Sequence, residues 1–147
     1  MALLHRSSSE TRSMRAVARQ RENYTHDVKA GDHSITVDEP EDQGGDDLGP
    51  SPQELLAAAL ASCTAVTMEM YARRKGWDTS GLAVDCRYTP AERGCPTRFE
   101  LVMKMPAHLS EEQVERLQVI AAKCPVHRTL DGEVMFKERV ERMSPVA

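Results

Sequence analysis

Apolar residues recur at helical spacing in one long stretch, from Pro50 to Trp77. Pro52 suits the first turn of a helix, and Gly76 stands where a left-handed residue commonly ends one. The spacing predicts a helix whose inward stripe comprises Leu56, Leu60, Cys63, Thr67 and Met70. Cys63 is therefore expected at mid-helix on a buried face. On this stretch alone, a structural core cysteine is the simplest interpretation, because a free cysteine packs as a small hydrophobic residue.

A second helix is predicted to begin after Ser110. Ser110 and Gln113 have the spacing of a capping box, and an apolar stripe follows at Val114, Leu117, Ala121 and Cys124. Pro125 is expected to end this helix, so that Cys124 lies in its last turn. A short turn through His127 and Arg128 is expected next.

Alternating apolar and polar residues predict strands on both sides of the first helix. Residues 17–38 are expected to form a β-hairpin that turns at residues 30–32, and residues 81–88 and 98–105 a second hairpin. A last strand is predicted over residues 133–140. The order β-β-α-β-β-α-β indicates an α+β fold with two central helices packed on antiparallel sheets. Such packing is expected to bring Cys63 and Cys124 near each other.

Length and charge narrow the class of protein. The 147 residues are expected to form one domain over residues 15–147, after a disordered or loosely attached N-terminus at residues 1–14. The formal net charge is −4 and basic residues do not cluster, so no nucleic-acid partner is expected. No apolar run approaches the roughly 20 residues that cross a bilayer, and the N-terminus lacks the apolar centre of a secretory signal. We therefore expect a cytoplasmic protein without a membrane partner.

The cysteines are not expected to form structural disulfides, because cytosolic thiols are normally kept reduced. Cys86 lies on the apolar face of a predicted strand, which favours core packing, and Cys95 lies in a turn. Cys63 and Cys124 could act together on a peroxide. A thiolate attacks one peroxide oxygen and becomes a sulfenic acid, and a second thiol condenses with it to a disulfide. Because a helix C-terminus disfavours a thiolate, Cys63 is the better attacker and Cys124 the better resolver.

The stretch Pro-Ser-Pro-Gln-Glu-Leu-Leu-Ala-Ala-Ala-Leu-Ala-Ser-Cys-Thr, with Cys124-Pro125-Val126-His127 later in the chain, resembles the OsmC/Ohr family of osmotically inducible and organic-hydroperoxide-resistance proteins. The resemblance covers about residues 20–142 and points to a divergent OsmC-like subgroup. It implies the OsmC-like fold, in an intertwined homodimer with the active site at the subunit interface. It also implies a cysteine-based peroxidase of oxidative-stress defence, which reduces small organic hydroperoxides with a peroxidatic Cys63 and a resolving Cys124. Neither a metal nor a cofactor is implied, and a dithiol or lipoyl-type partner would be the reductant.

Two residues that activate the thiol in this family differ here. Gln53 replaces the glutamate that directly follows the proline, and residues 43–46 contain no counterpart of the family's arginine. Glu54 cannot replace that glutamate, because it lies about 180° around the helix from Cys63. Another cation must then support the thiolate, and the candidates nearest in sequence are His127 and Arg128. Both also have simpler interpretations, as a packed turn residue and a surface charge.

Three alternatives remain open at the level of sequence. An OsmC-fold protein with lost or altered peroxidase activity could serve as a small-molecule binding protein. A thiol-dependent enzyme could act on another small electrophile. A metal site could be built from Cys63, Cys124 and His127, although zinc would need a fourth ligand or a water molecule.

Overall fold

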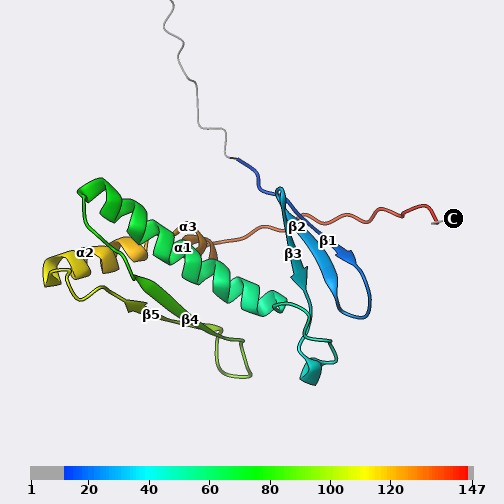
Figure 1. The fold of residues 1–147 in the computed structure, drawn as a ribbon. Helices are drawn as coiled ribbons and strands as arrows, with labels where there is room; N and C mark the ends of the chain where they lie inside the picture. The colour runs from blue at the N-terminus through cyan, green and yellow to red at the C-terminus, as the bar shows by residue number, and fades with distance from the viewer. Residues whose placement is uncertain (1–11, 146–147) are drawn as a thin grey trace, which may run out of the picture. The chain divides into compact units, whose positions relative to one another are not determined.

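The computed structural model describes residues 12–145 and has the predicted α+β composition, with two antiparallel sheets and helices (Figure 1). The chain divides into two compact units, residues 1–55 and 56–147. The predicted loose segment at residues 1–14 falls mostly on residues 1–11, which lie outside the described residues.

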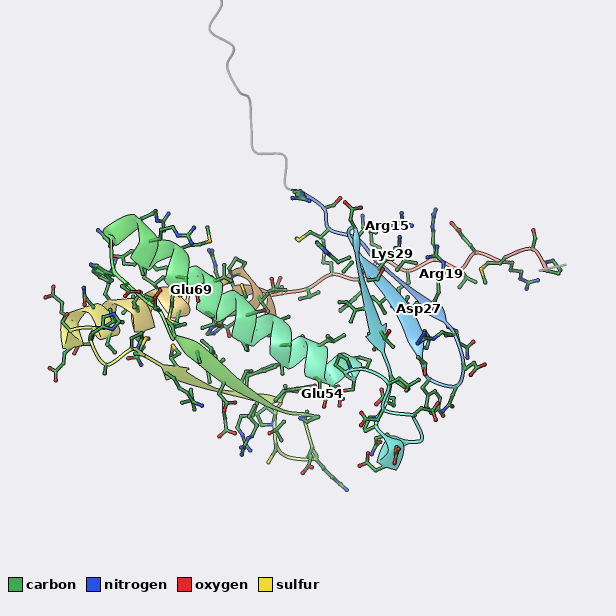
Figure 2. All side chains as sticks on the ribbon, viewed as in Figure 1. Arg15, Arg19, Asp27, Lys29, Glu54 and Glu69 are labelled. Atoms are coloured by element: carbon green, nitrogen blue, oxygen red, sulfur yellow. The ribbon has the colours of Figure 1, made fainter. Side chains whose placement is uncertain are left out.

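The first unit contains a three-stranded antiparallel sheet in the order β1 (Ala16–Gln20), β2 (His26–Ala30) and β3 (His33–Val37). The predicted hairpin is β2–β3, which turns at Gly31 with a φ of 61°. The additional strand β1 pairs with β2, and it escaped prediction because polar side chains interrupt its apolar pattern. Arg19 stands opposite Asp27, and Lys29 opposite Val17, on a largely charged face of the sheet (Figure 2).

The acidic loop after β3 is organised around one buried carboxylate, Asp38, which is 1% exposed. Its oxygens accept hydrogen bonds from the Thr25 hydroxyl at 3.0 Å and from the backbone N–H groups of Glu39, Asp46 and Leu48 at 2.8, 3.3 and 3.2 Å. Burial alone would raise the pKa of Asp38, but these hydrogen bonds outweigh it and lower the pKa. The loop, which includes the short 3₁₀ helix η1 (Glu41–Gln43), is thereby fixed ahead of the long helix.

The long helix α1 spans Pro52–Lys75, and its predicted ends are confirmed. Gly76 is left-handed, with a φ of 72°. At the N-terminus, the Ser51 hydroxyl accepts from the Glu54 N–H at 3.2 Å, while the Glu54 carboxylate accepts from the Ser51 N–H at 2.8 Å. This reciprocal pair is a capping box, and it gives Glu54 a structural task at the helix terminus.

The predicted inward stripe of α1 is wrong by part of a turn. The buried residues are Leu60, Thr64, Met68 and Ala72, at a constant spacing of four. Met70, which was predicted to be buried, is 60% exposed, and Cys63 is half-buried at the edge of the stripe. Small side chains at Thr64 and Ala72 let neighbouring elements approach that line of the helix closely, and this selects it over the more apolar one.

The second unit packs α1 with the hairpin β4 (Ala83–Thr89) and β5 (Arg98–Lys104) and with α2 (Glu111–Ala121). The hairpin and the Ser110–Gln113 capping box are confirmed. The core of the second unit consists of Met68, Ala72, Leu109, Leu117 and Ala121. Leu117 is completely buried, which contributes about 1.5–3 kcal/mol relative to an exposed leucine. This core fixes the helices that carry the cysteines.

Two predicted elements of the C-terminal part are wrong. α2 ends at Ala121, and the predicted turn at residues 127–128 belongs to a third helix, α3 (Pro125–Leu130). No strand forms over residues 133–140 in the described chain. The alternating pattern in that segment is real, but a strand needs a paired edge, and the β4–β5 sheet has only its two strands. Phe136 is 81% exposed and Val140 93% exposed.

Within residues 12–145 one helix, α1, is long and apolar enough to cross a membrane by length and composition. Its most apolar 18-residue window has a mean hydropathy of 1.4 and is 22% buried. The expectation that no apolar run approaches this length is therefore wrong. A single helix of this kind is weak evidence for a membrane span, because the core helix of a soluble protein passes the same test.

Candidate functional site

The structure brings Cys63 and Cys124 into direct contact within the second unit. Cys63 projects from α1 and is half-buried, whereas Cys124 immediately precedes α3 and is completely buried. Both thiols are free, and a hydrogen bond links their side chains. Two sulfur atoms that share a hydrogen bond need only a small adjustment to form a disulfide.

Cys124 is at the beginning of a helix, where the sequence predicted the end of one. It is the N-cap of α3, with Pro125 in the first turn, which is a favoured position for proline. The backbone N–H groups of Val126 and His127 help to lower the pKa of its thiol, although no side-chain hydrogen bond caps the helix at Cys124. The electrostatic argument that disfavoured a thiolate at Cys124 is therefore reversed, because unpaired N–H groups at a helix N-terminus stabilise negative charge.

Two threonines of α1 complete the surroundings of the thiols. Thr64 is 1% exposed, and its hydroxyl interacts with the Cys124 sulfur and lies 2.8 Å from the carbonyl oxygen of Leu60. The Thr67 hydroxyl interacts with the Cys63 sulfur and lies 2.7 Å from the Cys63 carbonyl oxygen. Each sulfur thus has a hydroxyl group beside it.

These contacts shift the two pKa values in opposite directions. Burial is the main reason why the pKa of Cys63 is raised, and the interaction with Cys124 raises it further. Burial alone would also raise the pKa of Cys124, but hydrogen bonds from Cys63, the His127 N–H, Thr64 and the Val126 N–H outweigh it and lower the pKa. Of the two thiols, Cys124 is therefore the one whose pKa is lowered and Cys63 the one whose pKa is raised.

The three residues predicted to support the thiolate, His127, Arg128 and Gln53, differ in their exposure and in their distance along the chain from Cys124. His127 contributes its backbone N–H to Cys124, and its half-buried side chain lines a cavity. Arg128 is exposed, and Gln53 is exposed in the first turn of α1. The interactions that most strongly lower the pKa of Cys124 come from neutral donors. Neither cation thus has the role that the sequence suggested for it.

A cavity of about 570 Å³ lies near the cysteine pair, with Leu60 of α1 and His127 of α3 among its lining residues. Its apolar lining comes from α1, the β4–β5 hairpin and α3, and consists of Leu56, Leu60, Tyr88, Phe99, Leu101 and Leu130. The rings of Tyr88 and Phe99 are stacked at a centroid distance of 4.8 Å. Leu60 precedes Cys63 by one helical turn, and His127 borders both the cavity and Cys124. An apolar group of modest size fits such a space.

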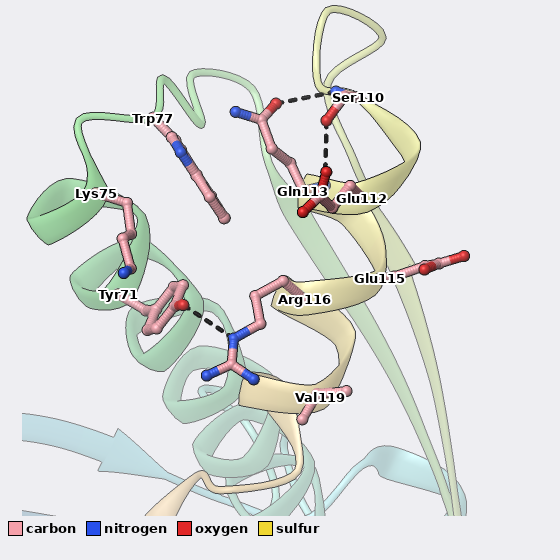
Figure 3. A pocket seen from close by; sticks show the side chains of 9 residues that line it. All are labelled: Tyr71, Lys75, Trp77, Ser110, Glu112, Gln113, Glu115, Arg116 and Val119. Carbon is pink, nitrogen blue, oxygen red and sulfur yellow. Dashed lines mark hydrogen bonds between the residues drawn. The ribbon is translucent and has the colours of Figure 1, made fainter.

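A second hollow, of about 680 Å³, lies between the C-terminal part of α1 and α2 (Figure 3). Its lining is mostly polar, and Arg116 Nε donates a hydrogen bond of 2.9 Å to the Tyr71 hydroxyl. This bond is the main reason why the pKa of Tyr71 is lowered. Neither cysteine of the pair lines either hollow, but the apolar cavity has His127, which is near Cys124, in its lining.

The proposed combination of metal ligands does not assemble. Among residues 12–145, no group of three or more His, Cys, Asp or Glu side chains is arranged to hold a metal ion. The His127 ring does not join the two sulfur atoms as a third ligand. The remaining cysteines lie apart from the pair, with Cys86 half-buried on β4 and Cys95 exposed in the following turn.

Sequence reasoning missed Thr64 and the helix α3. Pro125 carried a usable signal, since proline is as typical of a helix start as of a helix end. Thr64 could be found only by predicting the buried face of α1 correctly. Its polar side chain interrupts the apolar pattern from which that face would be predicted.

The fold and the site together define the class of this protein: it is an α+β protein in which thiols from two helices face each other. The chain belongs to the OsmC-like protein family, whose model matches residues 44–139, well over half of the sequence. The resemblance predicted from the cysteine motifs is thereby confirmed. The family fold is that of a soluble protein, in which α1 is a central helix.

Solved structures agree with this assignment. The OsmC-like protein of Mycoplasma pneumoniae is 20% identical, with a TM-score of 0.70 over 83% of this chain and 89% of that chain. An organic hydroperoxide resistance protein from Elizabethkingia anophelis is 21% identical, with a TM-score of 0.64 over 85% and 92%. The organic hydroperoxide resistance protein OhrB of Bacillus subtilis is 19% identical, with a TM-score of 0.57 over 82% and 91%. No curated protein matches the chain. At these identities the likeness establishes the fold.

Proposed function

We propose that this protein is a thiol-dependent peroxidase that reduces organic hydroperoxides, with Cys63 as the peroxidatic and Cys124 as the resolving cysteine. The direct contact of the two thiols carries the proposal. Cys63 is half-buried and can be reached by a small substrate, whereas Cys124 is completely buried and has Cys63 as a reaction partner. This asymmetry supports the order of the two roles.

The chemistry needs only the two sulfur atoms and the peroxide. The Cys63 sulfur attacks the terminal peroxide oxygen, the O–O bond breaks, and the organic part leaves as an alcohol after it takes up a proton. Cys63 becomes a sulfenic acid. Cys124 then attacks this sulfur, hydroxide leaves as water, and a Cys63–Cys124 disulfide remains. Two electrons have passed from the dithiol to the peroxide.

The apolar cavity beside the pair supports an organic substrate over hydrogen peroxide. Leucines and aromatic residues make up most of its lining, beside Thr97, His127 and Asp131, and burial of a hydrocarbon group against them contributes roughly 25 cal/mol per Å² of apolar surface. A tertiary alkyl or aryl hydroperoxide would place its hydrocarbon part in this cavity. The peroxide group would then reach toward Cys63.

The active form proposed here is a homodimer in the cytoplasm. Residues 133–140 carry exposed apolar side chains in the pattern of a strand, and α1 exposes Val66 and Met70, which a second copy would cover. An intertwined arrangement could pair residues 133–140 with a strand of the other chain. A dithiol or lipoyl-type partner would restore the reduced cysteines.

A second candidate function rests on the raised pKa of Cys63, together with Gln53 in place of the family's acid. A thiol that is protonated at neutral pH reacts slowly unless a base assists it. The same cavity could then bind a small apolar molecule, or present Cys63 to another electrophile, without peroxide turnover.

A turnover assay tests the proposal. The protein is mixed with cumene hydroperoxide and dihydrolipoamide, and oxidation of the dithiol is followed in the wild type, Cys63→Ser and Cys95→Ser. Peroxidase function predicts turnover in the wild type and Cys95→Ser and its loss in Cys63→Ser. Equal rates in all three proteins, or tight binding of cumyl alcohol without turnover, would favour the second candidate.

A further inference from the structure

We infer that the hollow between the C-terminal part of α1 and α2 is a second binding site, which takes a small aromatic carboxylate. Arg116 on α2 and Lys75 on α1 hold the carboxylate, and Trp77 packs against the ring. The hollow has a volume of about 680 Å³, which is in the range of small-molecule sites. It is separate from the cysteine pair and goes beyond the proposed peroxidase.

Tyr71 holds the guanidinium of Arg116 in the hollow. Arg116 Nε donates a hydrogen bond of 2.9 Å to the Tyr71 hydroxyl, and the guanidinium carbon lies 5.3 Å from the centroid of the same ring. Figure 3 shows the Arg116 side chain reaching from α2 toward Tyr71 on α1. A guanidinium has several N–H donors, and this bond uses one of them. Its terminal nitrogens are therefore oriented for a further acceptor.

Lys75 adds a second positive charge beside the same ring, with its Nζ 5.7 Å from the Tyr71 centroid. The two carboxylates of the lining, Glu112 and Glu115, come from α2. Within residues 12–145 neither forms an ion pair with a cation of the hollow, and Figure 3 shows Glu115 directed away from Tyr71. The hydrogen bond from Arg116 is the first cause of the lowered pKa of Tyr71, and the charges of Arg116 and Lys75 contribute. The α1 side of the hollow is thus positive.

Trp77 provides an apolar wall for a flat ring. It is half-buried, packs against the core of the second unit and also lines the hollow. Its ring meets Tyr71 edge to face, with centroids 5.7 Å apart and planes at 68°, so the two rings do not stack. Val119, which is 53% exposed, adds an aliphatic surface at the other end of the hollow (Figure 3). An aromatic ring gains apolar contact at such a wall.

The chemistry of the lining selects a carboxylate with a single negative charge. The planar fork of Arg116 matches the two oxygens of a carboxylate, and hydrogen bonds between charged partners are the stronger ones. A phosphate with two negative charges would be repelled by Glu112 and Glu115 and would gain nothing from Trp77. A cationic ligand would meet Arg116 and Lys75. A ring that carries one carboxylate satisfies both the cations and the apolar wall.

The single tryptophan of the chain makes the site directly observable. Trp77 gives one indole N–H resonance, which is followed by NMR as the reduced full-length protein is titrated in separate experiments with benzoate, benzyl alcohol, acetate and inorganic phosphate. We expect a saturable shift with benzoate. Benzyl alcohol lacks the charge and acetate lacks the ring, so each should bind at least about fivefold more weakly. Phosphate should not saturate the shift. None of these measurements involves a peroxide.

Variants then assign the contacts. Arg116→Gln should weaken benzoate binding about tenfold, and Tyr71→Phe, which keeps the ring but removes the acceptor that orients Arg116, about threefold. Lys75→Gln should weaken it about threefold and Glu112→Gln should tighten it about twofold. Arg93→Gln is the matched control, because Arg93 is exposed in the turn after β4.

Melting temperatures identify any variant that fails to fold. Saturation by benzoate that depends on Arg116 and Lys75 and is unaffected in Arg93→Gln would support the site. The inference is overturned if benzoate does not saturate the Trp77 shift by about 10 mM, or if benzyl alcohol binds as tightly as benzoate. It is also overturned if Arg116→Gln and Lys75→Gln both bind benzoate as the Arg93→Gln control does.

Discussion

Cys63 and Cys124 hydrogen-bond to each other, and the contact raises the pKa of the first and helps to lower that of the second. The half-buried Cys63 is therefore the weaker acid of the pair, and the buried Cys124 is the stronger acid. Neutral groups lower the pKa of Cys124, first the Cys63 thiol and then the His127 N–H, the Thr64 hydroxyl and the Val126 N–H. No acid or arginine is among the main groups that shift these two pKa values in the described residues, in contrast to what the family resemblance led us to expect.

The core that supports the site should be sensitive to cavity formation. Leu117 is completely buried against α1, so Leu117→Ala should lower the free energy of unfolding by about 2–5 kcal/mol. Val119 is on the same helix and 53% exposed, and Val119→Ala should change it by less than about 0.5 kcal/mol. Urea denaturation measures both. Equal losses would show that α2 does not pack as described.

The capping box of α1 should contribute more to stability than Gln53, the neighbouring residue that replaces the family's glutamate. Ser51→Ala removes the hydroxyl that accepts from the Glu54 N–H and should cost about 0.5–2 kcal/mol of stability. Gln53→Ala, at an exposed position of the same turn, should be nearly neutral. Thermal unfolding followed by circular dichroism compares them. A larger loss for Gln53→Ala would indicate a contact that this structure does not contain.

Asp38 should make the stability of the folded protein depend on pH. Its folded pKa is lowered, so its contribution is present above the unfolded value of about 4 and is lost as pH falls through the folded pKa. Asp38→Asn should lower the melting temperature at neutral pH, and the difference from the wild type should shrink in acid. Asp32→Asn, in an exposed turn, provides the control. A difference that is independent of pH would mean that the carboxylate charge is not what stabilises the loop.

The segment at residues 133–140 should report on assembly. Phe136 is 81% exposed in the single chain, and Phe136→Glu should convert the proposed homodimer to a monomer at micromolar concentration. Met143→Glu changes a residue that is 94% exposed just beyond the predicted strand and should leave the dimer intact. Light scattering coupled to size-exclusion chromatography gives the mass. A wild-type monomer, or a dimer that tolerates both changes, would refute a dimer built on this segment.

Regular periodicity predicted much of the fold. The ends of α1, the β4–β5 hairpin and the capping box of α2 follow from local patterns that the structure retains. The errors arise where local patterns compete with packing. Small residues, rather than the most apolar ones, select the buried line of α1, and Pro125 begins a helix instead of ending one. Residues 133–140 have the pattern of a strand but no edge to pair with in the described chain.

The candidate site was predictable only in part. The approach of Cys63 to Cys124 followed from two helical stripes and a family resemblance. The pKa shifts of the pair did not, because the pKa of Cys124 depends on groups from different elements: the Cys63 thiol and the Thr64 hydroxyl on α1, and the N–H groups of His127 and Val126 on α3. Backbone N–H groups cannot be recognised from residue types. The sequence therefore indicated the side chains of His127 and Arg128 as the nearest candidates.

The most direct test of the account is to map the disulfide formed on oxidation. The reduced protein is treated with one equivalent of t-butyl hydroperoxide, the remaining thiols are blocked, and the peptides are identified by mass spectrometry. The account predicts a Cys63–Cys124 disulfide within one chain, with Cys86 and Cys95 still reduced, and a sulfenic acid at Cys63 in Cys124→Ser. Oxidation at Cys95 alone, with Cys63 and Cys124 both recovered as thiols, would contradict it.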